Sequence, residues 1–178
     1  LNVIKKNCKS LLDLINQLLD YKKVENSGFT INKTTFTLYE TITTTLDNYK
    51  FTAQSRQISF EQEINVPKNL NVYMDRGALE KILNNLLTNA LKYCKSSIKF
   101  TCEYNADRDE FVMSIKDDGI GIAESNIHNI FKPFFREDEF NQLGAGIGLF
   151  LVKHLVESHN GQIIVDSQKG NGSEFVVT

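Results

Sequence analysis

Three polar side chains are spaced so that one side of a helix would present them together. Asn85 and Asn89 are one helical turn apart, and Lys92 follows three positions later, within residues 75–93, whose apolar pattern predicts a helix. Magnesium takes few ligands from proteins, so one amide oxygen could complete its coordination together with phosphate oxygens and waters. The row therefore suits a magnesium-bound polyphosphate, although similar rows also occur on helices that only face solvent.

A glycine-rich segment precedes another predicted helix. Gly144, Gly146 and Gly148 would let backbone N–H groups approach an anion at the start of that helix. The dinucleotide pattern G-x-G-x-x-G does not fit, because Leu149 stands where the third glycine is needed, and Lys153 lies too far into the helix for a Walker A loop. A loop that only caps a helix is the alternative.

Asp117 ends a predicted strand and is followed by Gly119 and Gly121. Its carboxylate could point into a cleft and accept a hydrogen bond from an exocyclic amine, or it could be an ordinary turn aspartate. The order of the motifs favours the first interpretation. The amide helix is followed by D-x-G-x-G, then F-x-P-F-F-R, then G-x-G-x-G-L, all within one predicted domain of mixed helices and strands.

This set of motifs resembles the catalytic domain of two-component sensor histidine kinases, within the Bergerat-type ATPase superfamily. The likeness runs from about residue 25 to the end and implies an α+β fold, a two-layer sandwich in which helices cover one face of a mixed β-sheet, preceded by one long N-terminal helix. The motifs that carry it are an N box at residues 85–93, glycine boxes at 117–121 and 144–149, an F box at 131–136, and His159-Asn160-Gly161 where the family has His-Gly-Gly.

The resemblance implies roles for individual residues. Asn89 would coordinate Mg²⁺ with Asn85 nearby, Lys92 would contact phosphate, and Arg136 would reach the terminal phosphate of ATP. Asp117 would recognise the adenine amino group. The other expected nucleotide contacts are Tyr93, Gly119, Gly121, Ile122, Gly144, Gly146, Gly148 and Leu149.

The chain departs from the family pattern at three places. Asp118 stands where the family usually has Asn, and Ala145 where Thr is common. The segment between Arg136 and Gly144 is short for the family's ATP lid, which leaves the closing motion of that lid an open question.

The family likeness implies transfer of the γ-phosphate of Mg-ATP to a histidine, for relay to the receiver domain of a response regulator. Hydrolases of the same superfamily place a glutamate base one turn before the magnesium asparagine, and this chain has Asn85 there. Without a base to activate water, transfer to an incoming nucleophile is favoured over hydrolysis. A nucleotide-binding scaffold without kinase activity is the non-enzymatic alternative.

The N-terminal segment has the pattern of a separate helical element. Apolar residues recur at steps of four and three, which is typical of a coiled-coil seam, and they are Ile4, Cys8, Leu11, Ile15 and Leu18. The polar run at residues 25–28 predicts a boundary, so we expect a partial domain at 1–24 and the catalytic domain at 25–178. Residues 1–24 resemble the second helix of the family's dimerization and histidine phosphotransfer hairpin, which would pair in a homodimer. Docking of this helix on its own domain is the alternative.

The three histidines, His128, His154 and His159, all lie within the catalytic-domain pattern. None is followed by an acidic residue on a predicted bundle helix, as the family's acceptor would be. We therefore expect the acceptor histidine upstream of Leu1, and the chain to be a piece of a longer protein.

The amino-acid composition argues against several other classes of protein. A net charge of −2 gives no basic field for nucleic acid. Three widely spaced cysteines without a C-x-x-C pair favour neither a disulfide framework nor a zinc site. No apolar run approaches the roughly 20 residues that span a bilayer. We expect the chain to be cytoplasmic, while a longer parent protein could carry a membrane anchor.

Around the motifs the sequence predicts an ordered set of elements. Thr37 and Glu40 form a capping-box pattern, which predicts the start of a helix. A short extended piece is expected around Phe29 and Ile31, and a short helix over residues 124–130. The remaining expected elements are strands at residues 58–64, 72–74, 98–104, 111–115, 163–166 and 175–178, and a last helix that ends at Asn160-Gly161.

Overall fold

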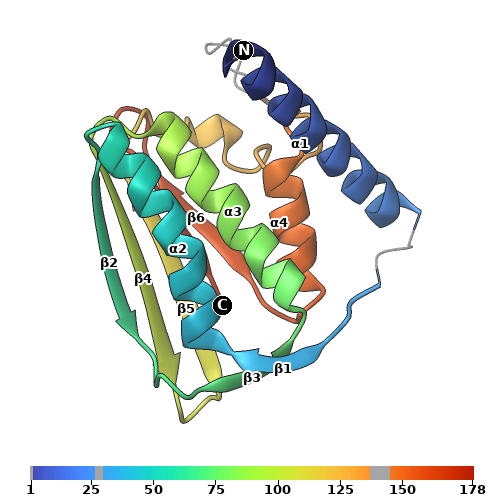
Figure 1. Cartoon of the computed structure of the whole chain (residues 1–178), viewed down its shortest axis with the longest axis vertical. Helices are drawn as coiled ribbons and strands as arrows, with labels where there is room; N and C mark the ends of the chain where they lie inside the picture. Colours follow the sequence, from blue (N-terminus) through green and yellow to red (C-terminus); the bar gives the residue numbers. More distant parts are fainter. Residues whose placement is uncertain (1, 27–29, 137–144) are drawn as a thin grey trace.

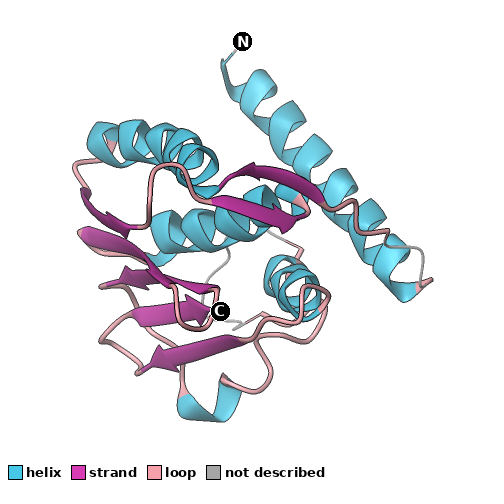
Figure 2. Ribbon diagram, turned by 90° about the horizontal axis from the view of Figure 1, so that it is seen from below, coloured by secondary structure: helices cyan, strands magenta, loops and turns pink. Residues whose placement is uncertain are grey.

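The computed structural model describes residues 2–26, 30–136 and 145–178. A five-stranded mixed sheet has the order β2-β4-β5-β7-β6, and three helices lie against one of its faces (Figures 1 and 2). Strand β2 pairs with β4 in parallel, and the other neighbours are antiparallel. The strands are β2 (Ser59–Asn65), β4 (Ser97–Asn105), β5 (Glu110–Asp117), β6 (Ile163–Ser167) and β7 (Ser173–Val177), and the covering helices are α2 (Leu38–Ser55), α3 (Arg76–Tyr93) and α4 (Gly148–Glu157). The predicted α+β two-layer sandwich is confirmed.

The core lies between this sheet and the three helices. Along β4 the side chains of Ile98, Phe100 and Cys102 are at most 1% exposed, while the intervening residues point to the other face. This alternation is what a strand with one buried face requires. Burial in this layer also raises the pKa of the Cys102 thiol to about 12.

Helix α3 is fixed at its N-terminus by Asp75. The Asp75 carboxylate caps the helix by accepting a hydrogen bond from the Ala78 N–H at 3.0 Å. The other carboxylate oxygen accepts the Asn32 N–H at 2.9 Å. The start of α3 is therefore tied to the segment that follows the N-terminal helix.

Several predicted details are wrong. Thr37 precedes α2, but its side chain forms no capping hydrogen bond. Thr37 also ends strand β1 (Thr34–Thr37), and the antiparallel pairing of β1 with β3 (Asn71–Met74) places its hydroxyl 3.3 Å from Asn71 Oδ1 instead. Of the predicted extended piece, Ile31 precedes β1 and belongs to no strand of the sheet, and Phe29 lies outside the described residues.

The helix predicted over residues 124–130 is only a 3₁₀ turn, Glu124–Asn126, followed by further turns. A segment this short gains too few hydrogen bonds to repay helix nucleation. Burial of Ile130, which is 7% exposed, anchors the segment to the core instead.

The N-terminal helix α1 (Asn2–Glu25) has two faces with different surroundings. One face packs on the domain, where the Tyr21 ring lies 5.1 Å from the Phe134 ring and 5.5 Å from the Phe150 ring between centroids. The other face carries large apolar side chains that are 45–60% exposed, namely Leu11, Leu12, Ile15, Leu18 and Leu19. The helix thus contacts its own domain and still presents most of the predicted heptad seam, of which the Ile4 side chain lies outside the described part. No helix in the described part of the chain is long and apolar enough to cross a membrane.

We expect the exposed face of α1 to make the chain self-associate, because water is a poor solvent for such an apolar stripe. Sedimentation should reveal a concentration-dependent dimer that disappears when residues 1–24 are deleted. Leu11→Ser should weaken the dimer by about tenfold or more, as expected for loss of one buried leucine, whereas Lys33→Ser, an exposed position outside α1, should leave it unchanged. A strict monomer at all concentrations would contradict this prediction.

Candidate active site

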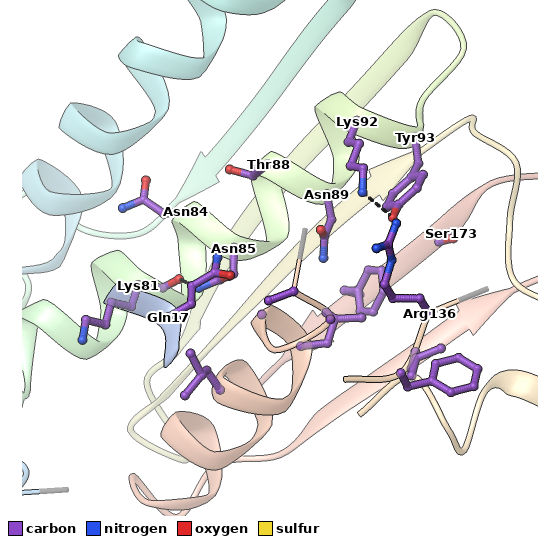
Figure 3. Close-up of a pocket in the computed structure, with 18 of the residues that line it drawn as sticks. Gln17, Lys81, Asn84, Asn85, Thr88, Asn89, Lys92, Tyr93, Arg136 and Ser173 are labelled. Carbon is purple, nitrogen blue, oxygen red and sulfur yellow. Dashed lines mark hydrogen bonds between the residues drawn. The ribbon is translucent and has the colours of Figure 1, made fainter. Parts of the chain in front are cut away.

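A cavity of about 810 Å³ lies beside α3 and α4 (Figure 3). This volume is in the range of small-molecule sites. Gly119 is not among the lining residues, and Gly144 lies outside the described residues. The cavity brings together the other site residues predicted from the sequence, which are Asn85, Asn89, Lys92, Tyr93, Asp117, Gly121, Ile122, Arg136, Gly146, Gly148 and Leu149.

The two asparagines of α3 are held differently. Asn85 Nδ2 donates a hydrogen bond to the Lys81 carbonyl at 2.8 Å, which leaves its Oδ1 facing the start of α4. A Cβ at Gly148 would lie only 2.6 Å from that oxygen, so glycine at 148 gives Asn85 its room. The half-buried carboxamide of Asn89 has no hydrogen-bond partner within the described part of the chain, and it lines the cavity beside Lys92 (Figure 3). Asn89 is therefore the amide available to a ligand.

The donor set fits a magnesium ion that is brought in by phosphates. The Asn89 amide oxygen is the kind of hard ligand that magnesium accepts. Residues 2–26, 30–136 and 145–178 contain no group of three or more His, Cys, Asp or Glu side chains placed to hold a metal. Most ligands of such an ion would consequently be phosphate oxygens and waters.

Cationic and aromatic groups gather at the C-terminal end of α3. Lys92 Nζ donates a hydrogen bond to the Tyr93 hydroxyl at 2.9 Å and lies 4.6 Å from the centroid of the Tyr93 ring. Arg136, after the F-x-P-F-F segment, reaches the same cavity with an exposed side chain (Figure 3). Two positive charges therefore lie at this end of the cavity, where an anionic ligand would be attracted.

Asp117 is the buried acidic group of the cavity, with 7% exposure. Burial raises the pKa of its carboxyl to about 6, against the opposing effect of hydrogen bonds from the Gly119 and Ser173 N–H groups. The Gly119 N–H lies 2.8 Å from Oδ1. A carboxylate held this way can accept a hydrogen bond from an amino group that enters the cavity.

The pKa of the neighbouring Asp118 carboxyl is shifted in the opposite direction. Partial burial disfavours its charge, but hydrogen bonds from Ser96, Ser97 and Lys95 hold the pKa of its carboxyl well below the usual range. Its oxygens accept the Ser96 hydroxyl at 2.6 Å and backbone N–H groups at 2.9–3.1 Å. Because every partner can donate, a carboxylate suits this position better than an amide, which accounts for the departure from Asn.

Two glycines let the loop after β5 pack tightly. A Cβ at Gly119 would lie 2.3 Å from the Tyr93 carbonyl oxygen, so only glycine lets this loop meet the end of α3. Gly121 has φ +63°, and a Cβ there would lie 2.0 Å from the Gln168 carbonyl oxygen. The close packing at both glycines keeps the loop, and with it Asp117, beside the cavity.

Sequence reasoning missed several residues of the cavity. Ser173 lines it from β7, and its N–H supports Asp117. Gly170 and Gly172 precede it in the sequence, and glycines at this spacing are a signal for a hairpin turn, not for a ligand site. The Tyr49 hydroxyl of α2 contacts Asn84 Oδ1 at 2.9 Å and Thr88 Oγ1 at 3.2 Å, a link between helices that no local pattern predicts.

Known proteins that resemble this chain are consistent with a nucleotide site in this cavity. Residues 74–178 match the family described as histidine kinase-, DNA gyrase B- and HSP90-like ATPase. The autoinducer 2 sensor kinase/phosphatase LuxQ of Vibrio parahaemolyticus is 33% identical over 186 residues, which cover 100% of the chain and 22% of LuxQ. The sensor histidine kinase WalK of Bacillus subtilis is 27% identical over 184 residues, 100% of the chain and 30% of WalK. The chain thus spans less than a third of the length of these relatives.

Solved structures give the same fold. Full-length ShkA, in complex with AMPPNP, aligns with a TM-score of 0.83 and 23% identity over 99% of this chain and 37% of ShkA. The catalytic domain of the histidine kinase ThkA aligns with a TM-score of 0.70 and 26% identity over 82% of this chain and 93% of that domain. The chain therefore belongs to the histidine kinase-, DNA gyrase B- and HSP90-like ATPase family, as an ATP-binding catalytic domain of the sensor histidine kinase type.

Proposed function

We propose that this domain binds Mg-ATP and transfers the γ-phosphate to a histidine of another helix, for relay to the receiver domain of a response regulator. The observation that supports this most directly is the composition of the cavity wall. The wall includes Asp117, which would recognise the base, Asn89, whose amide would bind the metal, and Asn85, where a hydrolase would have a glutamate base.

Each residue would have a distinct part in binding. The Asp117 carboxylate would accept the adenine amino group, and Lys92 and Arg136 would pair with phosphate oxygens. Asn89 would hold magnesium, which when bound would neutralise phosphate charge. The N-terminus of α4, which begins at Gly148, would add backbone N–H groups and a favourable dipole.

The acceptor must come from outside the cavity wall described here. None of the described residues that line the cavity is a histidine. His159 is also engaged elsewhere, because its Nε2 lies 3.2 Å from the Asp75 N–H and its Nδ1 lies 2.8 Å from the Leu155 carbonyl oxygen. With Nδ1–H donating to that carbonyl, Nε2 accepts from Asp75, so neither nitrogen is available as a nucleophile.

The proposed assembly follows from α1. We assign residues 1–24 to the second helix of a dimerization and phosphotransfer hairpin and residues 25–178 to the catalytic domain. The exposed apolar face of α1 would then pair within a homodimer that carries the acceptor histidine on the preceding helix. We place this activity in the cytoplasm, where ATP is available. A nucleotide-binding scaffold of the same family is the competing function.

The test is phosphoryl transfer to an added partner. Transfer depends on placing an imidazole in line with the γ-phosphate. Radiolabelled ATP should therefore leave the chain unlabelled, and it should label a polypeptide that carries the upstream helix and its histidine. The same polypeptide with that histidine replaced by glutamine is the control. Acid-labile label on the chain alone would contradict the assignment, and ATP binding without any transfer would favour the scaffold.

A further inference from the structure

An ion pair between α1 and α3 closes one end of the nucleotide cavity. Lys81 Nζ donates to Asp20 Oδ2 at 2.6 Å, and the two side chains are 44% and 15% exposed. Both residues line the cavity, and both also line an adjoining hollow of about 350 Å³ next to Lys23 and Asp75. The pair is therefore part of the wall between these two spaces.

Lys81 continues the row of nucleotide-facing residues along α3. Lys81, Asn85 and Asn89 follow at steps of four, and Asn85 is bonded to the Lys81 carbonyl. The loop that holds Asp117 packs against the other end of the helix, at Tyr93. A nucleotide with its base at Asp117 would extend its phosphates along α3 past Asn89 and Asn85. Lys81 comes next, about 6 Å further along the helix axis.

We infer that Lys81 binds the terminal phosphate of ATP, and that Asp20 of α1 competes with this phosphate for the Lys81 ammonium. The inference rests on the proposed function. In Figure 3 the Lys81 side chain is turned away from Asn89, in keeping with its bond to Asp20. The Lys81 side of the pair is open to solvent, with 44% exposure, so a triphosphate with several negative charges can reach the ammonium and displace Asp20.

Because Asp20 and the terminal phosphate of ATP compete for Lys81, the docking of α1 on the domain depends on whether the bound nucleotide has a third phosphate. The Tyr21 contact with Phe134 and Phe150 holds α1 on the domain next to the Asp20–Lys81 pair. If docked α1 weakens ATP binding by some factor, ATP must weaken the docking of α1 by the same factor. ADP lacks the phosphate that reaches Lys81 and would leave α1 docked.

Calorimetric titrations with Mg-ATP and Mg-ADP test the inference on the whole chain. Asp20→Asn should tighten ATP binding about two- to fivefold, the range expected for loss of a weak pair, and should leave ADP unchanged. Lys81→Met should weaken ATP about tenfold with little effect on ADP, and Lys81→Arg should retain ATP binding. Glu25→Gln is the matched control, since it removes a carboxylate of α1 that pairs with Lys22 and does not line the cavity.

Two further measurements test the coupling between ATP binding and the docking of α1. Asp20→Asn should have no effect on ATP in the Lys81→Met background. Hydrogen exchange at the amides of residues 14–21 should be faster with saturating Mg-ATP than with Mg-ADP. The inference is wrong if Asp20→Asn changes ATP and ADP affinity equally, or changes neither, or if exchange in α1 is the same with both nucleotides. Failure of the unsubstituted chain to bind Mg-ATP at all would instead refute the proposed function.

Discussion

Asp117→Asn is expected to lower the affinity for ATP by about ten- to a hundredfold, the range measured for hydrogen bonds to charged groups. The carboxylate offers only acceptors to the adenine amino group, whereas an amide can present a donor to it. Calorimetry with ATP measures the loss, and the weak binding of GTP should barely change. Asp166→Asn, an exposed aspartate of β6, is the control. Unchanged ATP affinity would show that Asp117 does not recognise the base.

The same carboxyl predicts a pH dependence of binding. Its pKa of about 6 in the folded protein means that it takes up a proton as the pH falls through 6. If the ionised form accepts the adenine amine, ATP affinity of the unsubstituted chain should fall between about pH 7 and pH 5, while the Asp117→Asn variant should show no such fall. Affinity that stays constant or rises below pH 6 would mean that the neutral carboxyl binds the base.

The effect of pH on the folding stability of the nucleotide-free protein should be opposite to its effect on ATP affinity. The folded-state pKa of about 6 lies above the ordinary value of 3.8, so proton binding at Asp117 favours folding at low pH, and this contribution is lost as the pH rises through 6. Asp117→Asn keeps an oxygen for the Gly119 N–H and removes the buried charge. The variant should therefore melt a few degrees higher than its parent at pH 7 to 8, and the difference should vanish near pH 4.

Asn89→Ala should remove the magnesium-dependent part of ATP affinity. Asn85, the nearest amide of α3, is turned toward Gly148 and bonded to the Lys81 carbonyl, so it does not replace the lost ligand. Titration with magnesium should reveal a loss of about tenfold or more, and titration with a chelator should give equal affinities for variant and parent. Asn48→Ala on α2 provides the matched control. An equal loss in both conditions would mean that Asn89 has a structural role.

The motifs and the strongly periodic elements were predictable from the sequence, because local spacing determines them. Helix α3 has its apolar side chains on one face, and the alternation of Ile98, Phe100 and Cys102 identifies β4. Strand β1 was not predictable, because it has four residues and its partner β3 is far away in the sequence. The Thr37–Glu40 pattern suggested a cap that strand pairing then excluded.

Contacts between distant elements account for what the sequence did not predict in the site. Asn89 and Asp117 belong to motifs, so their place in the cavity could be expected. Asp20, Tyr49 and Ser173 belong to none, and they reach the cavity because α1, α2 and β7 pack beside it. The packing of Tyr21 on Phe134 and Phe150 likewise depends on rings that are remote from it in the chain.

The position of β7 has a consequence for how the protein is made. β7 lies inside the sheet between β5 and β6, although it follows both of them in the chain. During synthesis β5 and β6 therefore leave the ribosome without the strand that joins them, and Ser173, which supports Asp117, arrives with that strand. The nascent domain must keep an incomplete sheet from aggregating until residues 173–177 are available. Chaperone demand during translation should consequently be concentrated in this interval, before nucleotide can bind.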